Sequence, residues 1–238
     1  SVNPLEELAM MTRVSPIGVG GIPDVESYPT RALNIHDTYY GNIDPLETPD
    51  GGGVGVQQQL AMGANISNIR GTFMMKPRAQ VNPTEILSTT PAMIPFVESN
   101  EGTRVTMASG QAKQAVSLQN PQIPCIQSGY ESILVPFLSD NFIKKSPVDG
   151  VVKEITDLVI IIQDSATGKD VAIDVSPITL KSGQGKNGLG LFNPVVKVGD
   201  KVKKDRIIAE GSNIKGGLIS NGLNMMVAFM PWKGYNFE

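Results

Sequence analysis

The sequence is poor in cysteine, histidine and aromatic residues, and it has no long apolar run. Its 238 residues include one cysteine, one histidine and 5% aromatic residues. A single cysteine, Cys125, excludes an internal disulfide and a cysteine-ligated metal cluster, so a reducing compartment is expected. No apolar run approaches the ~20 residues that a membrane-spanning helix needs. Residues 1–7 do not form a basic and then apolar signal segment, and we expect no membrane partner.

The sequence also lacks a strong charge of either sign. Its formal net charge is −3, with 40% hydrophobic and 18% charged residues, which is typical of a globular chain rather than a disordered one. The weak acidity argues against a small basic DNA-binding domain. Nucleic-acid binding stays open, because a large enzyme can gather basic residues in one channel that the average charge hides. The length allows one large domain or two small ones.

The first half carries helix-start signals separated by glycine-rich loops. Asn3 suits an N-cap, Pro4 suits the first helical position, and Glu6 can close a capping box, so a short helix is predicted there. Residues 17–22 (IGVGGI) are interrupted by glycine and do not favour a helix. Residues 44–56 hold two prolines and four glycines and are predicted to form a loop.

Two further helices are predicted before residue 115. Residues 82–85 (NPTE) repeat the capping pattern and open a second helix, which Pro91 would kink or end. A third short helix is expected over residues 100–114. Gly102 and Gly110 weaken that helix, which indicates that another group approaches its backbone closely.

The second half has the pattern of short β-strands. Turn residues separate brief apolar runs that alternate with polar positions. A basic, glycine-rich loop is expected over residues 181–190 (KSGQGKNGLG). The predicted strands cover residues 151–156, 158–162, 171–175, 195–198, 201–202, 207–209 and 225–230, the last two as buried runs. The predicted fold class is therefore α+β, with mostly β structure in the second half.

Single residues that could carry chemistry have ordinary structural interpretations. His36 has no cysteine or histidine partner in the sequence, so a hydrogen-bonded structural role is favoured over a metal site. Glu47 and Asp50 lie three residues apart in the predicted loop and are more often turn-formers or caps than a catalytic pair. Residues 183–186 (GQGK) lack the spacing and the ending of a nucleotide-binding P-loop. Composition alone therefore supports only a mixed globular domain.

A series of short segments along the whole chain carries a more specific signal. In order, their residues are 3–8 (NPLEEL), 13–15 (RVS), 18–21 (GVGG), 36–41 (HDTYYG), 47–51 (ETPDG), 94–98 (IPFVE), 104–107 (RVTM), 113–116 (KQAV), 129–131 (GYE), 149–152 (DGVV), 195–202 (VVKVGDKV), 209–211 (AEG) and 224–238 (NMMVAFMPWKGYNFE). Together they resemble the beta, or second-largest, subunit of multisubunit DNA-directed RNA polymerases. Each segment is a weak match alone, and their order makes the resemblance specific.

The sequence departs from that family in several places. The stretch between residues 60 and 82 is much shorter than usual, and Lys113 replaces a usual arginine. The chain starts without methionine and stops at Glu238, where the family continues with a second acid. We therefore expect a fragment or one part of a split or processed subunit. Divergence and reduction together suggest a large bacteriophage as the source, in the cytoplasm of an infected bacterial host or in the virion.

The resemblance implies a supporting role in nucleotidyl transfer. Arg104 would bind triphosphate oxygens of the incoming nucleotide, for which an arginine fork is suited; alternatively it forms a helix-surface ion pair. By the same resemblance, Glu238 would lie close to a second, nucleotide-borne Mg²⁺ and reach it through water. In isolation, Glu238 would be interpreted as an ordinary exposed terminal acid. The Mg²⁺ cofactor itself would be held mainly by an aspartate triad of a partner subunit.

Other residues would contact nucleic acid without reading its sequence. By the same resemblance, Lys113 and Gln114 would contact the RNA 3′ end or its backbone. Arg13 and Ser15 would line the wall around the RNA–DNA hybrid. Glu47 and Asp50 would belong to a rigid loop that buttresses this wall.

The resemblance also implies an architecture and a set of partners. We expect a fork-loop and hybrid-wall region over residues 1–80, an active-site helix and the start of a double-psi β-barrel over 81–145, a β-rich module over 146–193, and barrel strands over 194–238. The expected partners are a beta-prime-like largest subunit, the remaining beta-subunit segments, template DNA, RNA product and nucleoside triphosphates.

Met10 and Thr12 replace a usual histidine and arginine where ansamycin inhibitors bind in bacterial relatives, so we expect poor inhibition by ansamycins.

One alternative to an active polymerase part is a non-catalytic, beta-like structural module that binds a polymerase partner. A second alternative is an unrelated β-rich virion protein whose matches arise by chance.

Overall fold

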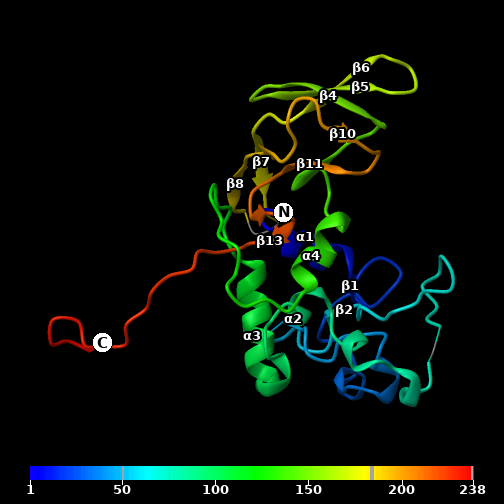
Figure 1. Cartoon of the computed structure of the whole chain (residues 1–238). Coiled ribbons are helices and arrows are strands. Elements are labelled where there is room, and N and C mark those ends of the chain that lie inside the picture. Colours follow the sequence, from blue (N-terminus) through cyan, green and yellow to red (C-terminus); the bar gives the residue numbers. More distant parts are fainter. Residues whose placement is uncertain (50, 75, 183–184, 237) are drawn as a thin grey trace.

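The computed structural model describes residues 1–49, 51–74, 76–182, 185–236 and 238. Short helices dominate its first half and short strands its second half, which confirms the predicted division between helical and β-rich parts (Figure 1). No helix within these residues is long and apolar enough to cross a membrane. The α-helices are α1 (Pro4–Met11), α2 (Thr89–Ala92), α3 (Gly102–Lys113) and α4 (Tyr130–Leu134). The 3₁₀ helices are η1 (Thr30–Leu33), η2 (Asp37–Tyr39), η3 (Arg78–Gln80), η4 (Pro83–Glu85), η5 (Val97–Ser99) and η6 (Val135–Phe137).

The strands are short, and they pair into separate small sheets. One sheet has the order β10-β4-β5-β6, a second has the order β3-β11-β9, and three pairs are β1-β2, β7-β8 and β12-β13. The strand bounds are β1 (Arg13–Val14), β2 (Gln58–Gln59), β3 (Ile143–Lys145), β4 (Gly150–Ile155), β5 (Val159–Asp164), β6 (Asp170–Asp174), β7 (Ile178–Lys181), β8 (Asn187–Gly190), β9 (Asn193–Pro194), β10 (Lys201–Val202), β11 (Ile207–Glu210), β12 (Ile214–Lys215) and β13 (Leu218–Ile219).

Helix α1 begins as its sequence predicts. The Asn3 side chain accepts a hydrogen bond from the Leu5 backbone N–H at 2.8 Å, and Pro4 takes the first helical position. The predicted capping box is wrong in detail, because the Glu6 carboxylate accepts from the Val2 N–H at 3.1 Å instead of from Asn3. Because this hydrogen bond uses one carboxylate oxygen of Glu6, the second oxygen is available to another part of the chain.

The helix predicted from residue 82 is wrong in length. Asn82 caps only the single turn η4, and α2 starts later. Pro91 lies inside α2, which ends one residue later at Ala92. It is the third residue of that helix, and proline is tolerated there because the N–H groups of a first turn have no partner within the helix.

Helix α3 confirms the third predicted helix, and its two glycines have different surroundings. A Cβ added to Gly102 would lie 3.1 Å from the Leu46 side chain, so the expected close approach is present there. A Cβ added to Gly110 would meet nothing within 4 Å, so that part of the expectation is wrong. Gly110 instead borders an open groove.

The β4, β5 and β6 strands were predicted nearly to their ends, whereas two neighbouring predictions need correction. The expected strand over residues 195–198 is the edge strand Asn193–Pro194 instead, and an edge position tolerates proline because no second neighbour needs its N–H. Part of the expected loop over residues 181–190 forms the hairpin β7-β8. The described residues form open sheets and no closed barrel, so the double-psi barrel stays a prediction.

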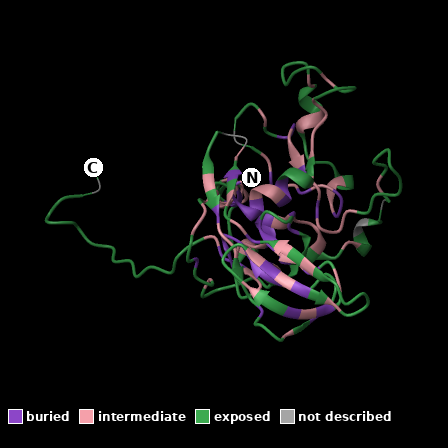
Figure 2. Cartoon of the chain, turned by 90° about the horizontal axis from the view of Figure 1, so that it is seen from above, coloured by how far each residue is buried: buried purple, intermediate pink, exposed green. Residues whose placement is uncertain are grey.

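The buried strand predicted over residues 225–230 is also wrong. Met226 and Phe229 are fully exposed, at 103% and 99%. The C-terminal tail, which we define as residues 223–236 and 238, extends away from the body of the molecule (Figures 1 and 2). Its apolar composition predicts burial, but no described segment covers it.

Two apolar cores hold the body together. The first packs α1 against α4 and the following segment, with Leu5, Leu134 and Phe142 almost fully buried. The second lies under the four-stranded sheet and contains Ile160 and Ile162, both with no exposed surface. The first core joins distant parts of the sequence, because Leu180 and Ile219 pack in the same cluster. This packing fixes the position of α1 and the β7-β8 hairpin around the groove described next.

Candidate functional site: a polar groove around the end of α3

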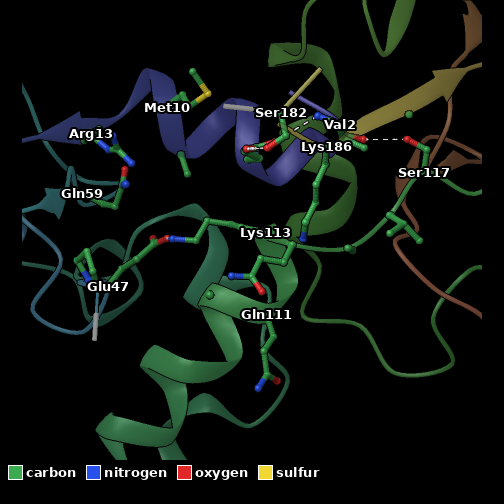
Figure 3. Close-up of a pocket in the computed structure, with 18 of the residues that line it drawn as sticks. Val2, Met10, Arg13, Glu47, Gln59, Gln111, Lys113, Ser117, Ser182 and Lys186 are labelled. Carbon is green, nitrogen blue, oxygen red and sulfur yellow. Dashed lines mark hydrogen bonds and ion pairs between the residues drawn. The ribbon is translucent and has the colours of Figure 1, made fainter. Parts of the chain in front are cut away.

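A groove of about 900 Å³ lies where α1, the end of α3, the loop after residue 44 and the β7-β8 hairpin meet (Figure 3). Its charged lining residues are three cations and two acids: Arg13, Lys113, Lys186, Glu6 and Glu47. Gln57, Gln59, Gln111, Gln114 and Gln119 add amide groups. The lining is therefore rich in hydrogen-bonding groups and contains more positive than negative side chains.

The end of α3 contributes two residues that the sequence predicts to bind nucleic acid. Lys113 is the last residue of α3 and Gln114 is its C-cap, and both line the groove. Lys113 Nζ lies 2.6 Å from Glu47 Oε1, and a quarter of the Lys113 side chain is exposed. Lys113 is thus oriented by an acid across the groove while it still faces solvent.

Glu47 belongs to a buried polar network. Only 3% of its surface is exposed, and its second carboxylate oxygen accepts a short hydrogen bond from the Ser88 hydroxyl. The Ser88 N–H donates to Asp44 Oδ2 at 2.6 Å, and Asp44 Oδ1 accepts from the Leu46 N–H at 2.7 Å. The view of Glu47 as a simple turn-former is therefore wrong, because it links the loop to both α2 and α3.

The rest of the loop is held by hydrogen bonds within the loop and by one from α3. The Thr48 hydroxyl donates to the Gln57 carbonyl at 3.0 Å and accepts from the Gly55 N–H at 2.9 Å. Thr106 on α3 donates to the Leu46 carbonyl at 2.7 Å. Asp50, the other acid predicted for this loop, lies outside the described residues. A side chain on this loop is consequently fixed relative to α3.

The opposite wall starts at strand β1. Arg13 pairs with Gln59 of β2 in antiparallel register, and both residues line the groove. Thr12, the C-cap of α1, donates from its hydroxyl to Gln59 Oε1 at 2.8 Å. Ser15 does not line the groove; its hydroxyl accepts from the Ile17 N–H at 3.2 Å. Of the two predicted wall residues, only Arg13 is brought to the groove.

Sequence reasoning missed Lys186 and Gln59 as groove residues. Lys186 follows the hairpin turn and directs its side chain toward the end of α3 (Figure 3). Its signal in the sequence is the basic, glycine-rich segment of residues 181–190, which was assessed only as a P-loop fragment. Gln59 carries no sequence signal, because a single amide in a two-residue strand has no distinctive spacing.

Two predicted catalytic residues lie away from the groove. Arg104 is exposed on α3, two turns before Gln111, and among the described residues it has no ion-pair partner. The alternative of a helix-surface ion pair is therefore wrong for the described part. Glu238 lies in the exposed tail, which Figure 1 shows extending away from α3. This chain by itself does not bring Arg104, Lys113 and Glu238 together.

The acidic residues do not fit a resident metal ion. Within the described ranges, no three histidine, cysteine, aspartate or glutamate side chains are grouped as metal ligands. Glu6 and Glu47 both line the groove, but each already accepts hydrogen bonds from neighbours. We therefore derive no step through a metal held by this chain.

The single histidine has the structural role predicted for it. His36 caps the short helix η2, with its Nδ1 accepting from the Thr38 N–H at 3.3 Å. Its side chain also lines a second, shallower groove that includes Tyr28 and Tyr39.

Comparisons with known proteins show which families the chain resembles in sequence. Residues 1–66 match the family described as RNA polymerase Rpb2, domain 3. Over 99% of its length, the chain is 30% identical to DNA-directed RNA polymerase subunit beta of Anaplasma phagocytophilum, and 28% identical to those of Bdellovibrio bacteriovorus and Rickettsia bellii. The chain spans about a fifth of the length of these relatives: 21%, 21% and 22%.

The alignments also bear on the shortened segment that the sequence predicts. They extend over 297 to 299 residues, which is more than the 238 residues of the whole chain. The relatives therefore carry additional residues within the aligned region. The similarity extends over 99% of the chain and therefore covers the groove and the tail alike.

Proposed function

We propose that this chain is part of the beta subunit of a DNA-directed RNA polymerase and acts only within a multisubunit complex. The observation that carries the proposal is the similarity to beta subunits over 99% of the chain. The groove supports it, because three residues that the resemblance assigns to nucleic acid, Arg13, Lys113 and Gln114, line one cavity. Arg13 is distant in sequence from the adjacent Lys113 and Gln114, and folding brings it to the same cavity.

In this proposal the groove holds RNA close to its 3′ end. Lys113 and Gln114 offer a cation and an amide at the end of α3, and Arg13 offers a guanidinium on the facing wall. Such groups bind phosphate and sugar oxygens without selecting a base, as a general transcriptase requires. The Glu47 network keeps Lys113 oriented before RNA enters, which lowers the entropy lost on binding.

The roles of Arg104 and Glu238 require the assembled complex. Arg104 is exposed and unpaired within the described residues, so it is available for triphosphate oxygens of an incoming nucleotide. Glu238 would approach a nucleotide-borne Mg²⁺ through water only when the tail is placed by other chains. The proposal assigns the resident Mg²⁺ to aspartates of a largest, beta-prime-like subunit.

The exposed tail supports a partner of this kind. Large apolar side chains at Met226, Phe229 and Trp232 are 103%, 99% and 70% exposed, and apolar surfaces of this kind mark interaction sites. We assign the partner to the remaining beta-subunit segments and the largest subunit, together with template DNA. A bacteriophage source, with the complex in an infected cell or in the virion, stays a prediction.

The test is primer extension by the chain assembled with its polymerase partners on an RNA–DNA scaffold. Arg13→Ala and Gln114→Ala should each slow nucleotide addition by about tenfold, as expected for one lost contact to a charged ligand. Arg104→Ala should raise the nucleotide KM. Lys169→Ala, at the exposed turn before β6, is the matched control and should change neither value.

The same experiment separates the second candidate function, a non-catalytic module that binds a polymerase partner. This alternative also explains the exposed tail. It predicts that Arg104→Ala and Glu238→Ala leave transcription by the assembled complex intact. Failure of any largest-subunit homologue to co-purify with the chain would contradict both functions.

A further inference from the structure

The β7-β8 hairpin is fastened to the start of α1. The Ser182 hydroxyl donates to Glu6 Oε1 at 2.8 Å, while the other Glu6 oxygen accepts from the Val2 N–H. Within the hairpin, the Ser182 N–H donates to the Lys186 carbonyl at 2.8 Å. Glu6 therefore holds the hairpin directly beside the groove, and the backbone of Lys186 is part of that attachment.

Close packing continues on the other side of Lys186. A Cβ added to Gly188 would lie 2.6 Å from the Ser117 hydroxyl oxygen and 2.8 Å from a methyl carbon of Val2. Those distances leave no room for a side chain, so the hairpin backbone lies directly against the segment that follows α3. The Ser117 hydroxyl is itself fixed, because it donates to the Val2 carbonyl at 3.1 Å. The position from which Lys186 projects is thus determined by contacts on both sides.

The charges of the groove do not cancel around Lys186. Glu47 is engaged by Lys113 and Ser88, and Glu6 is engaged by Val2 and Ser182. No acid in the described part of the chain forms an ion pair with Arg13 or Lys186. Two cations therefore face the same groove without a partner, one on each side of the Lys113–Glu47 pair (Figure 3).

We propose that Lys186 is a further phosphate-binding residue, and that Arg13, Lys113 and Lys186 form one track for the backbone of single-stranded RNA. This inference deepens the proposed function and rests on it. A flexible strand can bring successive phosphates to separate cations, whereas a compact anion meets only one or two of them. The described part of the hairpin would then hold Lys186 against the strand rather than serve as a nucleotide-binding loop.

The measurement is the salt dependence of RNA binding by the chain assembled with its polymerase partners. The probe is a short, fluorescently labelled single-stranded RNA, and its affinity is measured over a series of salt concentrations. Loss of one phosphate contact should reduce the slope of log K against log salt by about 0.7. Lys186→Ala should produce that change, Lys186→Arg should largely restore the slope, and the control Lys169→Ala should leave it unaltered.

The outcomes separate this inference from the broader function. If Arg13→Ala lowers the slope and Lys186→Ala does not, the role of Lys186 is overturned and the proposed function stands. If neither lowers it, the RNA-binding groove fails as well. If Lys186→Ala weakens binding of a fluorescent nucleoside triphosphate but leaves the RNA slope unchanged, a triphosphate and not RNA is the ligand.

A purely structural role for Lys186 gives a different result. A cation near the end of α3 can stabilise that helix through its dipole. In that case Lys186→Ala would lower the melting temperature followed by circular dichroism and leave the salt slope unchanged. That combination would overturn the inference.

Discussion

The groove and the C-terminal tail both contain segments that resemble polymerase beta subunits, but the chain organises them differently. At the groove, Lys113 is held by the buried Glu47, and Glu47 is held by Ser88. At the tail, large apolar side chains and Glu238 are exposed, and Asn224 is tied to the body by hydrogen bonds to Gln122 and Ile123. Contacts within this chain complete the first region, whereas the second needs a partner to give its side chains a fixed position.

This difference separates the side chains whose positions this chain fixes by itself from those that other chains must position. Buried polar side chains must find partners, so a network such as the one around Glu47 fixes its members within the fold. An exposed apolar segment gains free energy only when another surface covers it. We therefore expect substitutions in the groove to affect folding and RNA binding, and substitutions in the tail to affect assembly.

The largest expected effect is on assembly. Combined Phe229→Ser and Trp232→Ser substitutions should abolish co-elution of the chain with its polymerase partners in size-exclusion chromatography. The free energy of unfolding of the chain alone should change by less than about 0.5 kcal/mol, as for other exposed sites. Leu158→Ser, at an apolar position outside the tail that is 55% exposed, is the control and should alter neither property. If the double variant co-eluted normally, the tail would not be the segment that needs a partner, and the difference from the groove would be contradicted.

A smaller effect is expected on stability at the groove. The pairs Lys113–Glu47 and Lys153–Asp170 have the same 2.6 Å separation, but Glu47 is 3% exposed and Asp170 is 45% exposed. Glu47→Ala should lower the free energy of unfolding by about 3 kcal/mol, because Lys113 and Ser88 lose a buried partner. Asp170→Ala should cost less than about 1 kcal/mol. Equal losses in urea denaturation would show that burial does not distinguish the two pairs.

The wall of the groove gives a third test. Met10 lines the groove and Thr12 is engaged with Gln59, and the resemblance implies that they replace a histidine and an arginine of the ansamycin site. Ansamycins should therefore inhibit the assembled enzyme at least about tenfold less strongly than a bacterial enzyme, a difference of about 1.4 kcal/mol in binding. Inhibition of transcription at bacterial-like potency would contradict this prediction.

The smallest effect is a pH dependence far from both regions. At the β5-β6 turn, hydrogen bonds from the Thr167 hydroxyl and the Ala166 N–H lower the pKa of Asp164. Because the folded-state pKa is lowered, the stabilisation is present above the ordinary aspartate pKa and is lost as the pH falls through the lowered value. Asp164→Asn should flatten this part of the acid unfolding curve and leave RNA binding unchanged. If Asp164→Asn left the low-pH part of the unfolding curve unchanged, the stabilising role of Asp164 would be contradicted.

Local sequence signals predicted the elements whose ends depend on nearby residues. The cap at Asn3, the third helix and the strands β4, β5 and β6 were predicted closely, because capping groups, turns and alternation act over a few residues. The helix expected from residue 82 and the buried strand over residues 225–230 were wrong. In those cases the outcome depends on distant packing or on a covering surface, neither of which is encoded locally.

The sequence by itself determined the family resemblance, the α+β class and the choice of Arg13, Lys113 and Gln114 as nucleic-acid contacts. Only the tertiary structure decided that these three line one groove, that Glu47 is a buried partner of Lys113, and that Lys186 joins them from the β7-β8 hairpin. Residue types and their order set which chemistry is available. Which side chains meet depends on contacts between residues more than a hundred positions apart, such as the bond from Ser182 to Glu6, and those contacts form only when the apolar cores pack.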